Sequence, residues 1–349
     1  MYLNLEIKEI VKETDSALSF ILRSSDNTKI NFLPGQFITI IFDFEGEEIR
    51  RSFSISSSIY DLPDLRITIK KSSDGITNNF FNMVKIGDKI KAVPPVGNFT
   101  IRNDDSVLSD FIFIGAGSGI TPLYSMIKST LYGNDKSRII LVYGNSDENS
   151  IIFKNEIEQL ARTFSKRFFV YHILSHPINN WQGIKGRISI QNIKEIISSH
   201  KDHLSSSVYY YLCGPEGMMQ TAALALKELK VSRDRIHTES YNVCLLDETY
   251  EIENIEHEVT IIFRNREYKI KVSPDESILQ KALEHGLELP NSCQHGECGT
   301  CKAKLLAGTL KLISQTALSE HDIKNGYCLT CVGHPASENV VILYEDNFE

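Results

Sequence analysis

The sequence lacks the marks of a membrane or secreted protein. Nowhere do about 18 apolar residues run together, so no segment has the length and hydropathy of a membrane-spanning helix. Residues 1–10 alternate apolar and polar as in a β-strand, without the basic and then hydrophobic profile of a signal peptide. Cysteine is scarce, and its odd number, seven, argues against a disulfide framework. We therefore expect a cytoplasmic protein with no membrane partner.

An excess of positive charge is also missing. The chain carries 37 lysines and arginines against 45 aspartates and glutamates. The imbalance lies towards the end: residues 257–349 hold 9 basic and 13 acidic residues, and residues 243–256 hold none and 5. Nucleic-acid-binding surfaces are basic, so we expect no nucleic-acid partner. The acidic region fits either an ordinary solvated surface or docking to a partner with a basic face.

The length of 349 residues and an apolar content of 42% indicate several folded domains. Residues 1–104 show short alternating strands separated by turn residues, which predicts an antiparallel β-barrel. Residues 105–242 alternate strands with helices, which predicts an α/β domain with a parallel sheet covered on both faces. The predicted strands lie at 37–42, 65–70, 89–93, 111–114, 138–143 and 209–212, and the predicted helices at 122–131, 153–163 and 215–229.

The last domain follows a charged linker at 243–256 and spans residues 257–349. Strands at 259–263 and 268–272 flank a tight turn at Asn265, which predicts a hairpin. A helix is then expected with Ser273 as N-cap, Pro274 at N1 and Glu276 at N3, ending at Gly286. Two strands, a helix and a cysteine-rich loop match an α+β ferredoxin of the β-grasp type.

Three cysteines have the spacing C-x4-C-x2-C in that loop, and a fourth follows after 29 intervening residues. Thiolates spaced in this way hold a plant-type [2Fe-2S] cluster, which carries one electron. Gly296 and Gly299 allow a tight loop whose backbone N–H groups are aimed at the sulfurs. The four predicted ligands are Cys293, Cys298, Cys301 and Cys331.

A zinc ribbon uses the same kind of pattern, here the pairs Cys298/Cys301 and Cys328/Cys331. The 26 residues between the pairs exceed the usual separation of roughly 15–20. Zinc would also leave Cys293 without a role. We therefore favour the iron–sulfur cluster and expect Cys328 to be a small buried hydrophobe beside it.

Two further motifs carry groups suited to a flavin. Arg51, Ser52, Phe53 and Ser54 end a barrel strand. An arginine can hold a flavin pyrophosphate, an aromatic ring can lie against the isoalloxazine, and a hydroxyl can reach its N5. Gly75 and Thr77 offer a second phosphate cradle from backbone and hydroxyl groups.

A glycine-rich loop follows the first strand of the α/β domain and opens a helix. Its predicted binding residues are Gly115, Gly117, Gly119, Thr121 and Pro122. N–H groups and the helix dipole at such a position accept a pyrophosphate. Cys213, before Gly214 and Pro215, ends a later strand at the carboxyl edge where open α/β sheets bind ligands.

Taken together, the R-x-F-S, G-x-G-x-G-x-T-P, C-G-P and cysteine motifs resemble the ferredoxin–NAD(P)+ reductase superfamily with a C-terminal plant-type ferredoxin domain. The order of domains is similar to that in the reductases of phenylacetyl-CoA epoxygenase and ketosteroid hydroxylase. The resemblance implies that Arg51 binds the flavin phosphate, Phe53 stacks on the ring and Ser54 touches N5. It further implies that Thr77 assists the pyrophosphate, Thr121 and Cys213 face the nicotinamide, and Glu239 and Tyr241 lie near the flavin.

The implied activity is NADH-dependent electron transfer: a hydride passes to the flavin, and the cluster hands single electrons to an external protein such as an oxygenase or hydroxylase component. FAD is favoured over FMN because FMN-dependent relatives of the phthalate dioxygenase type lack the P-x-G-x-F turn present at 95–99. A redox-sensing protein without sustained turnover is the alternative from another functional class.

The turn after the second strand of the α/β domain, at 144–148, bears on nucleotide choice. It holds Asp147 and Glu148 but no cation. Carboxylates there suit a free ribose 2′-OH and repel a 2′-phosphate, so NADH is expected over NADPH. Lys154 is close enough in sequence to reverse that effect, which leaves NADPH as an alternative.

Overall fold

The computed structural model describes residues 2–44, 46–71, 78, 80, 83–101, 109–134, 136–178, 180–239, 256–273, 276–294, 296–313 and 317–345. The chain divides into two compact units. The first comprises Met1–Pro95 and Phe99–Tyr241, and the second consists mainly of Asn242–Glu349. None of the helices in the described ranges has the length and hydropathy needed to cross a membrane.

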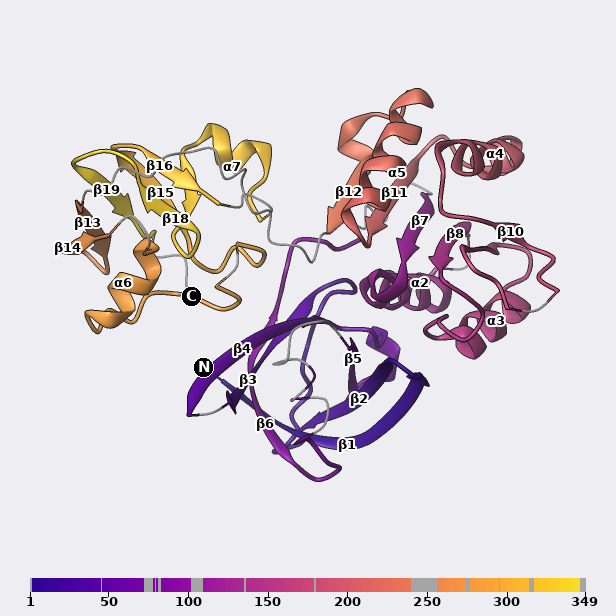
Figure 1. The fold of residues 1–349 in the computed structure, drawn as a ribbon, viewed down its shortest axis with the longest axis horizontal. Helices are drawn as coiled ribbons and strands as arrows, with labels where there is room; N and C mark the ends of the chain where they lie inside the picture. Colours follow the sequence, from indigo (N-terminus) through magenta and orange to yellow (C-terminus); the bar gives the residue numbers. More distant parts are fainter. Residues whose placement is uncertain are drawn as a thin grey trace. The chain divides into compact units, whose positions relative to one another are not determined.

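The first unit begins with the predicted antiparallel barrel (Figure 1). Its described strands are hydrogen-bonded in the order β4-β3-β6-β1-β2-β5, and a bridge between Ile55 and Ile67 brings the two edges together. Alternate residues of each strand fill one apolar core, as period-2 patterning requires. The strands are β1 (Leu3–Thr14), β2 (Ala17–Ser24), β3 (Phe37–Phe44), β4 (Glu47–Ser54), β5 (Leu65–Lys70) and β6 (Lys89–Val96), with the 3-10 helix η1 (Ile59–Asp61) after β4.

The rest of the first unit is the predicted parallel sheet, in the order β10-β9-β8-β7-β11-β12. Neighbouring strands in it pair in parallel, including β7 with β8 and with β11. The chain order reverses at β7, and ligands bind at such a switch point, beyond the carboxyl ends of the strands. The strands are β7 (Asp110–Ala116), β8 (Ile139–Asn145), β9 (Phe168–Leu174), β10 (Ile184–Lys185), β11 (Val208–Cys213) and β12 (Ile236–Glu239).

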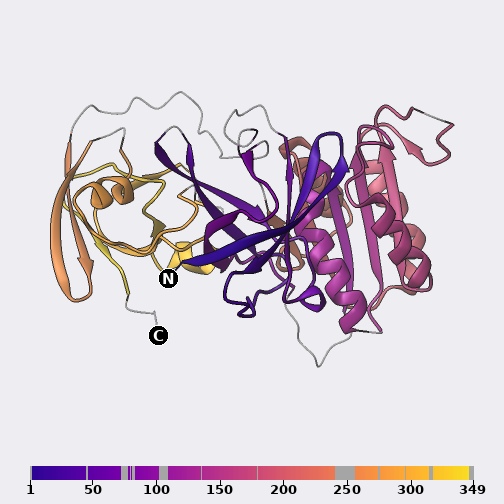
Figure 2. The ribbon, with the colours of Figure 1, turned by 90° about the horizontal axis from the view of Figure 1, so that it is seen from below.

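Helices cover both faces of this sheet (Figure 2). Odd-numbered strand residues such as Phe113 and Leu141 pack with α2 and α3, whereas even-numbered ones such as Ile112 and Ile140 pack with α4 and α5. Strands buried on both faces are almost continuously apolar, which is why β7 and β8 stand out in the sequence. The helical elements are η2 (Gly117–Gly119), α2 (Ile120–Gly133), α3 (Lys154–Thr163), α4 (Ile190–His200), η3 (Lys201–His203), α5 (Glu216–Glu228) and η4 (Arg233–Arg235).

The second unit is α+β, with a mixed sheet in the order β14-β13-β19-β15-β17 and a small sheet of β16 and β18. Strand β13 pairs antiparallel with β14 and parallel with β19. Helix α6 packs its apolar side chains against the sheet. The elements are β13 (His257–Phe263), β14 (Arg266–Val272), α6 (Ile278–Glu284), β15 (Lys302–Ala307), β16 (Leu310–Leu312), α7 (Glu320–Lys324), β17 (Tyr327–Leu329), β18 (Gly333–Pro335) and β19 (Val340–Leu343).

The predicted hairpin is confirmed, but the predicted start of the helix is wrong. Arg264 and Asn265 both have positive φ and form the two-residue turn between β13 and β14. Helix α6 begins at Ile278, with Ser277 as its N-cap accepting from the Gln280 N–H, rather than after Ser273. Ser273 and Glu276 still bond to each other: the Glu276 N–H donates to the Ser273 carbonyl, and the Ser273 N–H donates to Glu276 Oε2.

Candidate functional site

The predicted flavin motif lies at the end of β4, paired with β3. Strand alternation separates its side chains: Ser52 Oγ lies 2.9 Å from Thr39 Oγ1, while the half-buried Phe53 ring lies 6.4 Å from the Phe80 ring. Arg51 is half-buried and donates to the carbonyl of the preceding residue. An arginine in such a position, beside an aromatic ring, can bind a phosphate while the ring contacts a flat cofactor.

The last residue of the motif connects the barrel with the parallel sheet. Ser54 is 6% exposed, and its hydroxyl lies 3.4 Å from Glu239 Oε2 at the end of β12. Glu239 is in register with Cys213, which is in register with Gly115. Three predicted residues of the α/β domain therefore lie side by side at the carboxyl edge of the sheet, and the predicted flavin residue Ser54 reaches the same edge.

The glycine loop is shaped by close approach of two backbones. Gly117 has φ of +55°, a conformation that favours glycine. A Cβ on Gly119 would stand 2.1 Å from the Cys213 carbonyl oxygen, so β11 approaches this loop as closely as only glycine allows. The N-terminus of α2 follows directly, which makes the loop a site for a phosphate.

Thr121, predicted to face the nicotinamide, is almost fully buried. Its hydroxyl donates to the Ser118 carbonyl at 3.0 Å, so one of its interactions holds the glycine loop. Pro122 and Cys213 are buried beside it. In this structure Thr121 therefore contributes to the shape of the glycine loop.

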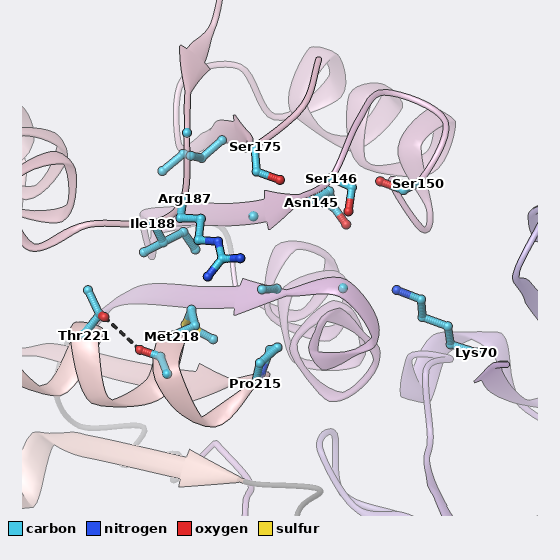
Figure 3. A pocket seen from close by; sticks show the side chains of 16 residues that line it. Lys70, Asn145, Ser146, Ser150, Ser175, Arg187, Ile188, Pro215, Met218 and Thr221 are labelled. Carbon is cyan, nitrogen blue, oxygen red and sulfur yellow. Dashed lines mark hydrogen bonds between the residues drawn. The ribbon is translucent and has the colours of Figure 1, made fainter. Parts of the chain in front are cut away.

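A cavity of about 570 Å³ opens beyond the carboxyl ends of the strands (Figure 3). Hydroxyl groups and two cations occupy its walls. Lys70 enters from barrel strand β5, and Arg187 from the segment between β10 and α4, with both charged groups pointing into the space. The lining residues are Lys70, Ala116, Gly117, Gly144, Asn145, Ser146, Ser150, Ile173, Ser175, Gly186, Arg187, Ile188, Pro215, Gly217, Met218 and Thr221.

The two carboxylates expected to repel a 2′-phosphate accept hydrogen bonds from backbone N–H groups. Asp147 accepts from the N–H groups of Asn149 and Ser150, and Glu148 accepts from the N–H of Ile178. Neither carboxylate lines the cavity, while Asn145 and Ser146 of the same turn do. The physical reason given for NADH preference therefore does not hold in this geometry, because the carboxylates are not part of the cavity wall.

The four predicted cluster ligands are all buried, with exposed fractions of 8% or less. They occur as two thiol pairs. Cys301 Sγ lies 3.2 Å from Cys331 Sγ, and a hydrogen bond with Cys293 lowers the pKa of the buried Cys298 thiol. The Thr300 N–H also donates to Cys298 Sγ at 3.4 Å. Thiolates are the metal-binding form, and four buried cysteines, three in the loop before β15 and one after β17, fit a [2Fe-2S] cluster.

Cys328 is arranged differently. Its thiol donates to the Ala303 carbonyl at 3.3 Å, and burial raises its pKa to about 12. The Cys328 thiol is thus engaged with the backbone of β15, whereas Cys331 Sγ is paired with Cys301 Sγ. The zinc set, which needs Cys328, is therefore disfavoured over the set that includes Cys293.

Comparison with known proteins agrees with the three-part organisation. Residues 3–101 match the oxidoreductase FAD-binding domain, residues 113–223 the oxidoreductase NAD-binding domain, and residues 262–336 the 2Fe-2S iron-sulfur cluster binding domain. The chain belongs to the ferredoxin–NAD(P)+ reductase superfamily. It is an oxidoreductase with FAD, NADH and [2Fe-2S] as its redox groups, and its C-terminal domain is a ferredoxin domain.

Individual relatives of this reductase match along almost their whole length. The ferredoxin reductase component of 3-ketosteroid-9-alpha-monooxygenase from Rhodococcus rhodochrous is 28% identical, covering 97% of this chain and 95% of its own. One component of the 1,2-phenylacetyl-CoA epoxidase from Escherichia coli is 28% identical, covering 98% of this chain and 97% of its own. The solved structure of phthalate dioxygenase reductase has the same fold, with a TM-score of 0.63, 21% identity and 98% coverage of both chains.

The sequence did not predict every residue that lines the cavity, and some predicted residues of the reductase lie outside the part of the chain that the structure describes. Lys70 and Arg187 were not predicted; the first ends an amphipathic strand and the second follows a glycine, and neither signal is specific. Gly75, Thr77 and Tyr241 lie outside the described residues. Among the predicted nucleotide-binding residues, Gly117 lines the cavity itself.

Proposed function

We propose that this reductase is the electron-supplying component of a multicomponent oxygenase, passing electrons from NADH to a separate oxygenase or hydroxylase protein. The observation that carries the proposal is the order of its domains, FAD, NAD and 2Fe-2S within one chain. Relatives that match nearly the whole chain are named as the reductase component of a ketosteroid monooxygenase and as part of a phenylacetyl-CoA epoxidase. An acidic ferredoxin domain suits a partner with a basic docking face.

FAD takes an electron pair as a hydride from NADH, and the [2Fe-2S] cluster carries electrons one at a time. We assign NADH to the cavity at the glycine loop. This cavity lies beyond the carboxyl ends of the parallel strands, where the strand order reverses. Arg51 would hold a flavin phosphate, and Phe53 would lie against the flavin ring. The contact of Ser54 with Glu239 supports a role for this pair in presenting a hydroxyl proton to the flavin.

We also propose the domain boundaries 1–104 for the FAD barrel, 105–242 for the NAD domain, 243–256 for a linker and 257–349 for the ferredoxin. The matched domain models lie inside these ranges, and the division between the two compact units falls at the same place as the start of the linker. We also propose a cytoplasmic location, because the cysteines that hold the cluster must stay reduced and the cytoplasm keeps thiols reduced.

The proposal is tested with holoenzyme, NADH and the oxygenase component encoded nearest to this reductase in its genome. We expect sustained NADH oxidation coupled to reduction of that component, at many turnovers per flavin. Cytochrome c serves as an artificial acceptor that reports on the reductase alone. Cytochrome c reduction without transfer to an oxygenase or hydroxylase would overturn the oxygenase assignment. A single stoichiometric reduction without turnover would instead identify a redox sensor.

A further inference from the structure

We propose that the buried hydroxyl of Tyr344, near the end of the chain, is a positioning group for the iron–sulfur cluster. It holds Thr330, which in turn ties the segment of Cys301 to the segment of Cys331. The inference rests on the assignment of these two cysteines as cluster ligands and does not depend on which protein accepts the electrons. It concerns a residue that lies outside the cysteine pattern.

Thr330 is a junction of four segments in the second unit. It lies between β17 and Cys331 and is fully buried. Its N–H and its hydroxyl both donate to the Cys301 carbonyl, at 3.4 and 3.2 Å. Its own carbonyl accepts from the Leu279 N–H in the first turn of α6, at 3.0 Å. The hydroxyl oxygen of Tyr344 lies 2.6 Å from Thr330 Oγ1 and completes the junction.

The direction of this hydrogen-bond chain follows from the groups that form it. A carbonyl oxygen only accepts, so the Thr330 hydroxyl directs its one proton to the Cys301 carbonyl. The Thr330 oxygen then acts as the acceptor, and Tyr344 is the donor in the 2.6 Å bond. Both O–H groups therefore point towards Cys301, and hydrogen bonds in such a chain polarise one another. The positive ends of the two dipoles face a predicted cluster ligand.

Tyr344 itself is held by the sheet. It follows β19, and its N–H donates to the Ile262 carbonyl of β13 at 2.9 Å. The residue is 4% exposed, and its ring meets the Phe263 ring edge-on, with 5.8 Å between the ring centres. A backbone bond and a packed ring keep the hydroxyl in one position. The sheet therefore supports the link between the two ligand segments, as outer groups do around a metal site.

The two linked segments carry sulfurs that lie close together, with Cys301 Sγ and Cys331 Sγ 3.2 Å apart. The β15–β17 ladder pairs Lys302 with Leu329, and the bonds between Thr330 and Cys301 continue it by one step. A [2Fe-2S] cluster needs its ligands at fixed separations, and hydrogen bonds around the ligands tune its potential. The hydroxyl chain therefore acts on retention of the cluster and on its reduction potential.

Removing the Tyr344 hydroxyl should have two effects. Tyr344→Phe keeps the ring but takes the donor away from the buried Thr330 oxygen, which weakens the link between the ligand segments. Release of iron to a chelator should become about tenfold faster. The positive ends of the O–H dipoles favour the reduced, more negative cluster, so its potential should fall in the variant. We expect the equilibrium constant for reduction to drop about threefold, or about 28 mV at about 59 mV per tenfold for one electron.

The test compares Tyr344→Phe with Tyr327→Phe in the full-length holoenzyme. Tyr327 lies in the same domain, next to Cys328, but its hydroxyl donates to Glu345 at 2.7 Å. The measurements are iron release to a chelator, the midpoint potential from a redox titration followed by visible absorbance, and thermal unfolding. Tyr327→Phe should match wild type in iron release and in potential.

A second background isolates the chain from the ring. Thr330→Val keeps the shape of the side chain and removes the hydroxyl through which Tyr344 acts, so it should also speed iron release and lower the potential. Adding Tyr344→Phe to Thr330→Val should then change neither quantity further, because residues that act through one another are not additive.

Four outcomes would contradict the proposal. Wild-type iron release and potential in Tyr344→Phe would overturn it, and so would equal changes in Tyr327→Phe. Faster iron release with an unchanged potential and a lowered melting temperature would assign Tyr344 to the stability of the domain alone. A potential that rises instead of falling would contradict the direction of the hydroxyl chain. Wild-type protein without about two irons and two sulfides per chain would instead overturn the ligand assignment on which the inference rests.

Discussion

The cavity of the first unit and the cluster cysteines of the second unit differ in how far they are open to solvent. The cavity is open, about 570 Å³ in volume, and lined by hydroxyls and two cations contributed by the barrel and the parallel sheet. The cluster loop is closed, and its four thiols are at most 8% exposed. A substrate that enters and leaves at every turnover needs access and moderate affinity, whereas a resident cluster needs exclusion of water and ligands that cannot move apart.

The largest effect is expected from substitution of a cysteine that holds the cluster. Cys331→Ser should abolish or severely destabilise the cluster, because a [2Fe-2S] centre requires four ligands and Cys331 is paired with Cys301. Cys328→Ala is the matched control, since its thiol donates to a backbone carbonyl. Iron and sulfide content and visible absorbance are the measurements, with about two of each per wild-type chain. A colourless Cys328→Ala protein would mean that the fourth ligand is misassigned.

The Glu156→Gln substitution should have a smaller effect, a loss of stability limited to the first unit, which holds the cavity. Burial opposes ionisation of Glu156, but its hydrogen bonds with Arg66 outweigh burial and lower its pKa. Glu156→Gln leaves the buried Arg66 with Glu13, 3.9 Å away, as its remaining charged partner among the described residues. The loss should cost about 2 kcal/mol and lower the melting temperature of the first unit by about 4–8 °C.

The cluster absorbance of Glu156→Gln should be that of wild type, since the change lies in the other unit. Lys194→Met is a suitable control, because Lys194 pairs with Glu228 on the surface and its loss should cost less than about 1 kcal/mol. Equal destabilisation by the two variants would show that the Arg66–Glu156 pair contributes no more than a surface ion pair.

The same contrast explains what the sequence could predict. Three predicted cluster ligands lie within nine residues of chain, so their spacing alone predicts them, and strand and helix periodicity predicts the three kinds of domain. The cavity is assembled from segments far apart in sequence: Lys70 comes from β5 of the barrel, and Arg187 from the segment after β10. Asp147 and Glu148 follow β8, as the sequence indicates. The direction of their side chains depends on hydrogen bonds to backbone N–H groups, which the sequence does not reveal.

The smallest expected effect concerns the second cation of the cavity. The nicotinamide end of the nucleotide must reach the flavin, so the adenosine end extends away from the barrel, towards the strands β8 and β9 and the wall that holds Arg187. With the nearby carboxylates turned away, Arg187 is the charged group of that wall best placed to attract a 2′-phosphate. NADH should still be used, but the margin over NADPH should depend on this residue.

Arg187→Gln should therefore lower kcat/KM for NADPH about tenfold and for NADH less than about threefold, since a single charge contact with a phosphate is lost with NADPH alone. Both nucleotides are measured at equal ionic strength. Lys185→Gln provides the control, because Lys185 is the last residue of β10, two positions earlier, and is not part of the cavity wall. An equal fall for the two nucleotides would place Arg187 at a group they share, such as the diphosphate.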